Sequence, residues 1–409
     1  MRLSIKNYLN ILFILSFFTV FFSQITYQSG IRVSVPFRYM EIIFFSIMIL
    51  QILSYKKDFL LNYKIKLFTF LLFIYFFIIT SITTLSNYNT IITGILYPAI
   101  SIYIFLHTVV LLFLITLVKT NKKIEFNKVL AKLLYLHLVI SLFLYITHLI
   151  GLNNIMLGVN YHSINIPRAM GLVAEPSHYS ILAWITFFYF FNLKKNSLIT
   201  YISLVAFLIS FSTTGIIFAL LTIIISIVLK PGKMFLVWLF LLGALFFLIP
   251  GEYLHRYYIR INSELFFLWS YIIEGNSIEF IAEGQNSRAI NIAHQIQLII
   301  NNWEHIIFGL GGSGSQVLLS GNLGNSFKGI LYVLAEYGVI GIIFILYIIV
   351  DLYIKTSNSI KPLFLAYFII SFFNPSGGNF GLDWLFTLFI IYLLSFSNTK
   401  ILHKKKNEK

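Results

Sequence analysis

The chain has 409 residues, of which 59% are hydrophobic and 11% charged, and its mean hydropathy is +0.89. This composition excludes an ordinary water-soluble globular protein and predicts an integral membrane protein. A net charge of +15 would point to nucleic acid in a soluble protein, but here most of the excess can set topology, and no nucleic-acid partner is expected. Because the chain contains no Cys, it has no disulfide, thiolate nucleophile or Cys-ligated zinc.

Apolar runs close to the roughly 20 residues that a helix needs to cross a bilayer recur between polar breaks along the chain. The expected fold is all-α, a single multi-pass membrane domain over residues 1–409. The boundary between the seventh and eighth runs, near Thr213, depends on charge alone. We place twelve runs near residues 8–25, 39–55, 65–85, 91–118, 129–152, 175–192, 197–212, 213–229, 234–249, 327–350, 362–373 and 380–397.

Positive charge predicts the orientation of these helices, because translocated loops are poor in Lys and Arg. With a cytoplasmic N terminus, 22 of the 29 basic residues fall on the cytoplasmic side, so both termini are expected inside. The two longest outer loops are then 153–174 and 250–326, and function is expected to face outward. The outer side keeps seven basic residues: Arg32, Arg38, Arg168, Arg256, Arg260, Arg288 and Lys328.

The same division separates the two kinds of cation, since 21 of 22 Lys are cytoplasmic and six of seven Arg are outside. An Arg guanidinium binds phosphate or carboxylate through two parallel hydrogen bonds, whereas Lys is a hydrated point charge. The outer arginines, above all Arg168 and Arg288, therefore predict an anionic ligand on the outer face. The alternative is that they extend to lipid headgroups, which applies chiefly to Arg32 and Arg38 near helix ends.

A first candidate site lies before the sixth helix, where Arg168 is followed by Glu175, Pro176 and His178. Pro176 suits the first position of a helix, which puts Glu175 near the N-cap and His178 in the first turn. A carboxylate and an imidazole beside an arginine could bind an anion and accept a proton. The plainer interpretation is a helix-start glutamate with an interfacial histidine.

A second candidate site runs from Asn286 and Arg288 into an amphipathic helix expected over 291–307. Its polar arc, which includes His294, carries mostly neutral hydrogen-bonding side chains and suits sugar hydroxyls. Alternatively, the helix rests on the bilayer with an unspecialised wet face. The apolar arc consists of Ile292, Ala293, Ile296, Ile299, Ile300, Trp303, Ile306 and Ile307.

Glycines follow this helix. The run at 309–315 could bind an anion through backbone N–H groups or act as a hinge. Asn325 then leads into a helix in which Gly338 and Gly341 are expected to permit close helix packing.

Polar side chains within the expected spans could mark an ion path. They form no chain of acids for a proton relay, so transport is disfavoured. No His and carboxylate cluster has metal-ligand spacing, so neither a metal nor another cofactor is expected. The residues concerned are Glu41, His107, His137 and His148.

Architecture and short motifs together resemble the O-antigen polymerase (Wzy-type) family, within the O-antigen polymerase and ligase superfamily. The architectural likeness covers the whole chain, and the motifs fall in two stretches, 168–177 and 286–341. They are R-x-x-G from Arg168 with E-P-S from Glu175, Ser287 with Arg288, F-G-x-G from Phe308 and E-x-G-x-x-G from Glu336.

The resemblance implies a metal-independent glycosyltransferase of the bacterial inner membrane whose active face is periplasmic. It would transfer the growing glycan from undecaprenyl pyrophosphate to the non-reducing end of a new repeat unit, in the biosynthesis of O-antigen or a related surface polysaccharide. Its partners would be the lipid-linked oligosaccharide and membrane lipid, with a chain-length regulator and a flippase as further candidates. The alternatives are an O-antigen ligase acting on lipid A core and a lipid-linked oligosaccharide flippase.

For such a transfer, positive charge is needed where the pyrophosphate leaves, a role that the resemblance gives to Arg168 and Arg288. Asn286 and Asn325 are further substrate-binding candidates. Related ligases have a His directly before an Asn at the end of the long outer loop, whereas Gly324 precedes Asn325 here, which argues against ligase activity.

A base must also accept the proton of the acceptor hydroxyl. Glu175 is the first candidate, and His178 and His294 follow it.

Overall fold

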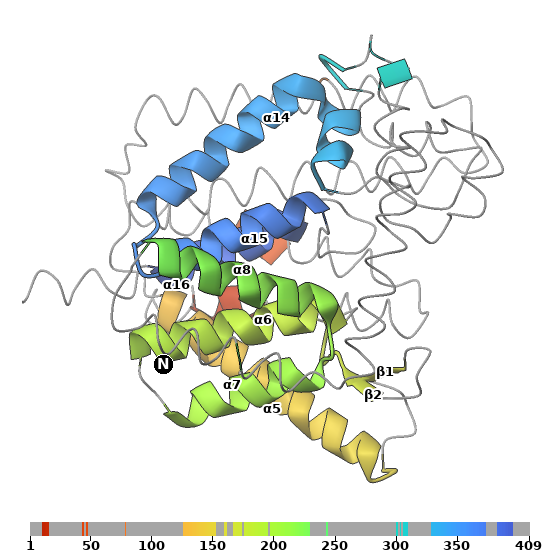
Figure 1. Ribbon diagram of the computed structural model, residues 1–409, viewed down its shortest axis with the longest axis vertical. Coiled ribbons are helices and arrows are strands. Elements are labelled where there is room, and N and C mark those ends of the chain that lie inside the picture. The colour runs from red at the N-terminus through yellow and green to blue at the C-terminus, as the bar shows by residue number, and fades with distance from the viewer. Residues whose placement is uncertain are drawn as a thin grey trace, which may run out of the picture. The chain divides into compact units, whose positions relative to one another are not determined.

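Helices make up 84% of the described part of the chain, as expected from the apolar runs. The chain forms two units, one of residues 1–77, 102–222 and 348–409 and one of residues 78–101 and 223–347. The structure is a computed structural model, and it describes residues 10–15, 43–44, 46–47, 78, 126–152, 159–161, 167–173, 176–194, 197–229, 243, 300–301, 303, 306–309, 329–373 and 383–395 (Figure 1).

Most of the described elements belong to the first unit. Two helices, α8 (Thr213–Leu229) and α14 (Gly329–Lys355), pass from one unit into the other. The first unit also contains α5 (Phe126–Leu149), β1 (Val159–Tyr161), β2 (Pro167–Ala169), α6 (Pro176–Tyr189), the π-helix η2 (Phe190–Lys194), α7 (Ser197–Ile209), α15 (Lys361–Phe373) and α16 (Asp383–Ser395).

The predicted runs that fall on described residues coincide with helices. α5, α6, α15 and α16 match the runs at 129–152, 175–192, 362–373 and 380–397. The division near Thr213 is confirmed, because α7 ends at Ile209 and α8 begins at Thr213. The runs near 8–25, 39–55, 65–85, 91–118 and 234–249 lie largely outside the described residues.

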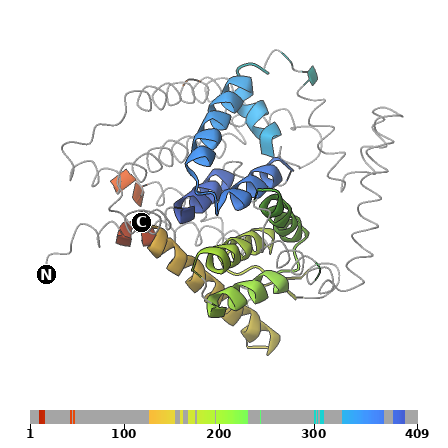
Figure 2. The same ribbon diagram turned by 60° about the vertical axis from the view of Figure 1, so that its left-hand side comes forward.

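Two features depart from the prediction. The outer loop 153–174 contains a two-stranded antiparallel sheet, β1 with β2, where no strand was expected. The predicted span 327–350 is not one straight helix, because α14 breaks at Gly338, where φ is 65° and ψ is −170°. Both views show α14 as two arms of a V (Figures 1 and 2).

The core of the first unit is built around α6, which packs against α7 on one side and α5 on another. Every residue from Tyr179 to Phe190 is buried. Trp184 is fully enclosed, with its ring centroid 4.9 Å from that of Phe187 and 5.1 Å from that of Phe207 on α7. A helix that is apolar and buried all round is typical of the centre of a bundle.

An apolar face of α5 is exposed. Leu136, Val139, Phe143 and Ile146 recur at the spacing of one helical face, and Phe143 is 64% exposed. Over Asn127–Leu149, α5 is long and apolar enough to cross a membrane, the one helix in the described ranges that passes this test. α7, α8 and α15 contain shorter apolar stretches.

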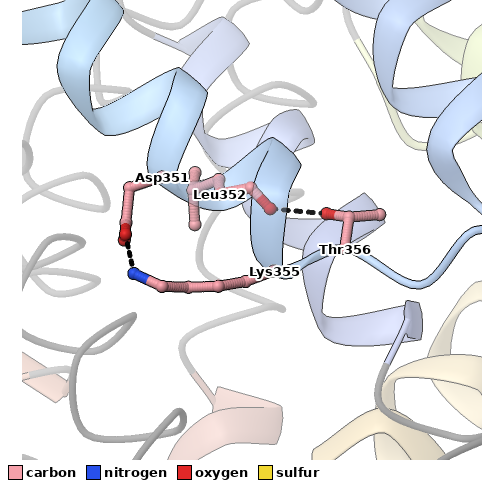
Figure 3. A network of polar contacts seen from close by, with 4 residues as sticks. All are labelled: Asp351, Leu352, Lys355 and Thr356. Atoms are coloured by element: carbon pink, nitrogen blue, oxygen red, sulfur yellow. Dashed lines mark hydrogen bonds and ion pairs between the residues drawn. The ribbon is translucent and has the colours of Figure 1, made fainter.

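The connection from α14 to α15 is short and basic. Lys355 forms an ion pair with Asp351 one turn earlier, and the Thr356 hydroxyl donates to the Leu352 carbonyl at 2.8 Å, which closes the last turn of α14 (Figure 3). Lys361, the first residue of α15, lies 5.1 Å above the ring of Tyr353.

Gly215 allows α8 to approach α6 closely. A Cβ at this position would lie 2.2 Å from Oγ and 2.5 Å from Cβ of Ser180, with Phe207 at 3.3 Å. The contact involves the base of the Ser180 side chain, so a rotamer change cannot relieve it. The sequence predicts only a boundary between two runs near this position, whereas the structure gives Gly215 a packing role.

We expect Gly215→Ala to lower the free energy of unfolding by about 1–3 kcal/mol, because the added methyl overpacks the contact with Ser180. Helical Gly243, which has no atom within 4 Å of a built Cβ, is the matched control. Gly243→Ala should leave stability unchanged or raise it by up to about 1 kcal/mol. Thermal unfolding of the purified proteins measures both, and equal effects of the two substitutions would contradict this packing role.

Candidate functional site

Arg168 lies on β2, at the centre of a short sheet. β2 pairs antiparallel with β1, with Asn160 opposite Arg168 and Val159 opposite Ala169. The Tyr145 hydroxyl, on α5, donates to the Pro167 carbonyl at 3.2 Å. The strand is therefore held from two sides, by β1 and by the last turns of α5.

The half-buried guanidinium of Arg168 is tied to the turn between α7 and α8. Its Nε–H donates to the Ser210 carbonyl at 3.2 Å. Ser210 follows the last residue of α7, where carbonyls have no partner within the helix and carry partial negative charge. The turn thus supplies a complementary partner for Arg168 and fixes the orientation of the guanidinium plane.

The turn itself has an unusual backbone. Phe211 has φ of 44°, a left-handed conformation that non-glycine residues rarely adopt. It comes between Ser210, whose carbonyl holds Arg168, and Ser212, whose Oγ accepts the Gly215 N–H at 3.2 Å and caps α8. Such strain persists where surrounding contacts determine it and is often found at functional sites.

After Arg168 the chain enters the helical bundle. Ala169, Met170, Gly171 and Val173 are all buried. Gly171 has φ of 58°, and a Cβ there would lie 2.2 Å from Ser141 Oγ and 3.0 Å from Tyr179 Cδ2. The R-x-x-G pattern therefore has a physical basis, because only glycine allows the chain to pass between α5 and α6 three residues after the arginine.

His137 holds this segment by a hydrogen bond. Its Nε2 accepts the Leu172 N–H at 3.3 Å, and its ring meets that of Tyr179 edge to face at 5.7 Å. A backbone N–H can only donate, so Nε2 carries no proton and the imidazole is neutral. This histidine, one of four polar residues considered for an ion path that the sequence disfavours, is a structural acceptor for the loop that carries Arg168.

α6 begins at Pro176, as predicted, and half-buried His178 lies in its first turn. The Ser180 hydroxyl donates to the Ser177 carbonyl at 2.8 Å, within the stretch that packs against Gly215. Ser180 on α6 therefore lies against the first turn of α8, and Arg168 on β2 is bonded to the residue that follows α7. Both α6 and α7 contact β2.

The described residues thus include two of the predicted site residues. Arg168 is bonded to the turn at 210–212, and His178 lies in the first turn of α6. Five further candidates lie outside the described residues: Glu175, Asn286, Arg288, His294 and Asn325.

Three contacts of the site could not be predicted from the sequence, although His137 itself was noted as a polar residue within a span. Ser210 contributes a backbone carbonyl, to which no side-chain pattern points. Ser141 and His137 lie on α5, and their relation to residues 171–172 depends on a contact between segments 30 or more positions apart. The one available signal of a turn here was the cluster of hydroxyl residues within 210–214, between two apolar helices.

Of the second candidate site, which runs from Asn286 into the helix expected over 291–307, the structure describes only the end. Ile300 and Asn301 are helical, and a turn at 306–308 follows. The Val339 N–H, just after the break in α14, donates to the Ile306 carbonyl at 2.8 Å. The F-G-x-G and E-x-G-x-x-G stretches are therefore adjacent in space, and Gly338 forms the break rather than the helix contact predicted for it.

Chemically, the Arg168 region combines a half-buried cation of fixed orientation with serine and threonine hydroxyls and the capped start of α8. A guanidinium in this setting binds phosphate or carboxylate oxygens more strongly than a fully solvated one, because local water competes less. The region therefore fits an anionic ligand better than a neutral or cationic one.

Comparison of the chain with protein-family models, curated proteins and solved structures finds no match. The resemblance to the polymerase family therefore depends on the residues and motifs quoted above, and it stays a prediction.

We expect Gly171→Ala to destabilise the protein more than Gly151→Ala does. Both glycines have positive φ, which costs an alanine roughly 1–2 kcal/mol, but a Cβ at Gly151 meets nothing within 4 Å. The clash of Gly171→Ala with Ser141 adds about 1–3 kcal/mol.

Adding Ser141→Gly to Gly171→Ala removes the atoms in conflict and should restore part of the difference. Unfolding midpoints of the three variants measure this. No recovery in the double variant would show that the loop tolerates the methyl in another way.

Proposed function

We propose that the protein is a membrane glycosyltransferase that polymerises lipid-linked oligosaccharide repeat units. It takes the growing glycan from undecaprenyl pyrophosphate and joins it to the non-reducing end of a new repeat unit at the periplasmic face of the bacterial inner membrane. The observation that carries this proposal is the oriented, half-buried guanidinium of Arg168, held by the Ser210 carbonyl.

Membrane location is supported by the faces that the helices expose. Beyond α5, exposed apolar side chains recur on α7 at Leu198, Tyr201 and Val205 and on α8 at Ile217 and Ile224. Apolar faces on several helices of one bundle are costly in water and favourable in lipid. They fit the multi-pass bundle of twelve helices that the hydropathy predicts.

Helix length bears on the depth of the site. α7 has 13 residues and is about 20 Å long, less than the roughly 30 Å of the hydrocarbon layer. With Lys194 and Lys195 at the cytoplasmic surface, the turn at 210–212 lies below the outer edge of the hydrocarbon. An arginine held there reaches the phosphates of a lipid carrier whose tail stays in the bilayer.

The transfer is a single displacement at the anomeric carbon of the donor sugar. The acceptor hydroxyl oxygen attacks the anomeric carbon of the donor sugar, and the bond from that carbon to the pyrophosphate oxygen breaks. The electron pair leaves with undecaprenyl pyrophosphate, where Arg168 and Arg288 offset the growing negative charge. The hydroxyl proton passes to a base, for which Glu175, His178 and His294 are the candidates.

The rival functions differ in their products. A ligase would place glycan on lipid A core without lengthening it, and a flippase would form no glycosidic bond. The hydrogen bond that fixes His137 as a neutral acceptor removes one of the polar residues that a transport path would use. Mass spectrometry of lipid-linked products separates the three, because only polymerisation yields longer glycans on the polyprenyl carrier.

We expect Arg168→Lys to reduce the polymerisation rate on the order of 100-fold, as loss of a donor that stabilises developing charge usually does. Lysine keeps the charge but cannot form two parallel hydrogen bonds to phosphate. Arg168→Ala and Arg288→Lys should behave similarly in reconstituted vesicles supplied with donor and acceptor. The control is Lys132→Ala on α5, an exposed cation assigned to the cytoplasmic side, which should retain activity.

Full activity in all the arginine variants would refute the pyrophosphate role. Circular dichroism and unfolding midpoints check that the inactive variants are folded.

We also predict the topology. Reporter fusions after residues 168 and 288 should report an extracytoplasmic location, and fusions after Lys195 and Lys361 a cytoplasmic one. The physical reason is the bias of Lys toward the untranslocated side. A cytoplasmic location of residue 168 or 288 would overturn the proposed site, because the glycan donor is expected on the opposite face.

A further inference from the structure

The backbone N–H groups at the break in α14 find their partners in another part of the chain. Gly338 leaves the helical conformation, so the N–H groups that follow it have no carbonyl partner within α14. The Val339 N–H donates to the Ile306 carbonyl at 2.8 Å, and the Ile340 N–H donates to the Ile307 carbonyl at 3.3 Å. The two segments are therefore joined by backbone hydrogen bonds, and we call this contact the α14 joint.

Glycine is required at the α14 joint for two reasons. Its φ of 65° is left-handed, and a built Cβ would lie 2.3 Å from the Ile307 carbonyl oxygen and 2.6 Å from the Gly309 nitrogen. Both atoms belong to the backbone and cannot rotate away. Any side chain at position 338 would push residues 306–309 out of contact.

The segment held by the joint exposes its apolar side chains. Ile300 is 59% exposed, Trp303 is 69% exposed and Ile307 is 53% exposed. Beyond the joint, Val339 and Ile343 on α14 are exposed as well. Ile300, Trp303 and Ile307 belong to the apolar arc expected for the amphipathic helix, and each of the three is exposed.

The length of α14 limits how far the joint can lie from the cytoplasmic surface. The arm from Val339 to Lys355 has 17 residues and is about 26 Å long, less than the roughly 30 Å of hydrocarbon. With Lys355 at the cytoplasmic surface, the joint lies at or just below the outer edge of the hydrocarbon. Broken backbone at that depth needs internal partners, which residues 306–307 supply.

We propose that residues 300–309 form a lipid-facing element in the outer leaflet, with Ile300, Trp303 and Ile307 in contact with acyl chains. This proposal depends on the membrane location that is part of the proposed function. Tryptophan is enriched at this interface because its ring has an apolar body and a polar N–H. Acyl chains are the occupant because the side chains are apolar and because the joint attaches them to a helix at hydrocarbon depth.

Lipid contact at residues 300–309 restricts which face of the outer loop can contact sugars. Ile300, Trp303 and Ile307 face lipid in this proposal. Contact with sugars is therefore left to the opposite side of the segment, which includes exposed Asn301. The joint also tethers residues 306–307 of the loop near the outer edge of the hydrocarbon.

The absence of native Cys allows a direct test. Single-cysteine variants Trp303→Cys and Ile307→Cys of the full chain are labelled with bimane and reconstituted in phosphatidylethanolamine and phosphatidylglycerol vesicles. Brominated acyl chains should quench both labels severalfold more than they quench a label at Asn301→Cys, the matched control two residues away from position 303. Aqueous iodide should show the reverse order.

Two other results would overturn the proposal. Quenching of 303 and 307 by iodide as strong as at 301 would place the face in water, and protection from both quenchers would place it against protein. Phe143→Cys on the exposed face of α5 separates this failure from that of the membrane location. Lipid quenching at 143 without quenching at 303 and 307 refutes only the lipid contact proposed for residues 300–309. Absence of lipid quenching at 143 refutes the membrane location.

The joint is tested by adding Gly338→Ala to Ile307→Cys. The methyl should displace residues 306–309 and reduce lipid quenching at 307, whereas Gly151→Ala, which strains φ without a contact, should leave it unchanged. Unchanged quenching in a folded Gly338→Ala variant would show that the joint does not hold the element. The single-cysteine comparison stands by itself where this variant does not fold.

Discussion

Backbone groups at interrupted helices need partners inside an apolar bundle, and this constraint explains most of the contacts around the site. Where α7 ends, the Ser210 carbonyl accepts from Arg168; where the loop enters beside α5, the Leu172 N–H donates to His137. Where α14 breaks, residues 306 and 307 supply the missing carbonyls. In lipid, each of these groups would cost several kcal/mol without its partner, so the segments that carry them are held firmly in position.

Glycine makes these interruptions possible. Gly171, Gly215 and Gly338 each lie where a Cβ would come within 2.3 Å of another atom, and two of the three have positive φ. The atoms they approach belong to Ser141, Ser180 and the backbone of Ile307, on elements distant in sequence. The three glycines therefore determine how closely a loop, a helix start and a broken helix approach their neighbours.

The sequence predicts the helices well and the site only in part. Run length and charge placed α5 to α8, α15 and α16, because apolar length and Lys distribution are local properties. The positive φ angles of Gly338 and Phe211 could not be predicted, because both depend on contacts with segments far away along the chain. Arg168 was predicted from its residue type and side of the membrane, whereas its partner, a backbone carbonyl, leaves no mark in the sequence.

The carbonyl of Ser210, which accepts the Nε–H of Arg168, has a chemical consequence. A carboxylate would neutralise the guanidinium and compete directly with an incoming phosphate, whereas a carbonyl at a helix C terminus offers only partial negative charge. The Ser210 bond therefore orients the cation without itself neutralising the positive charge. Orientation before binding reduces the reorganisation needed when charge develops on a leaving group, which is how preorganised donors accelerate transfer reactions. A strained turn at Phe211 is then the structural cost of presenting that carbonyl to the arginine.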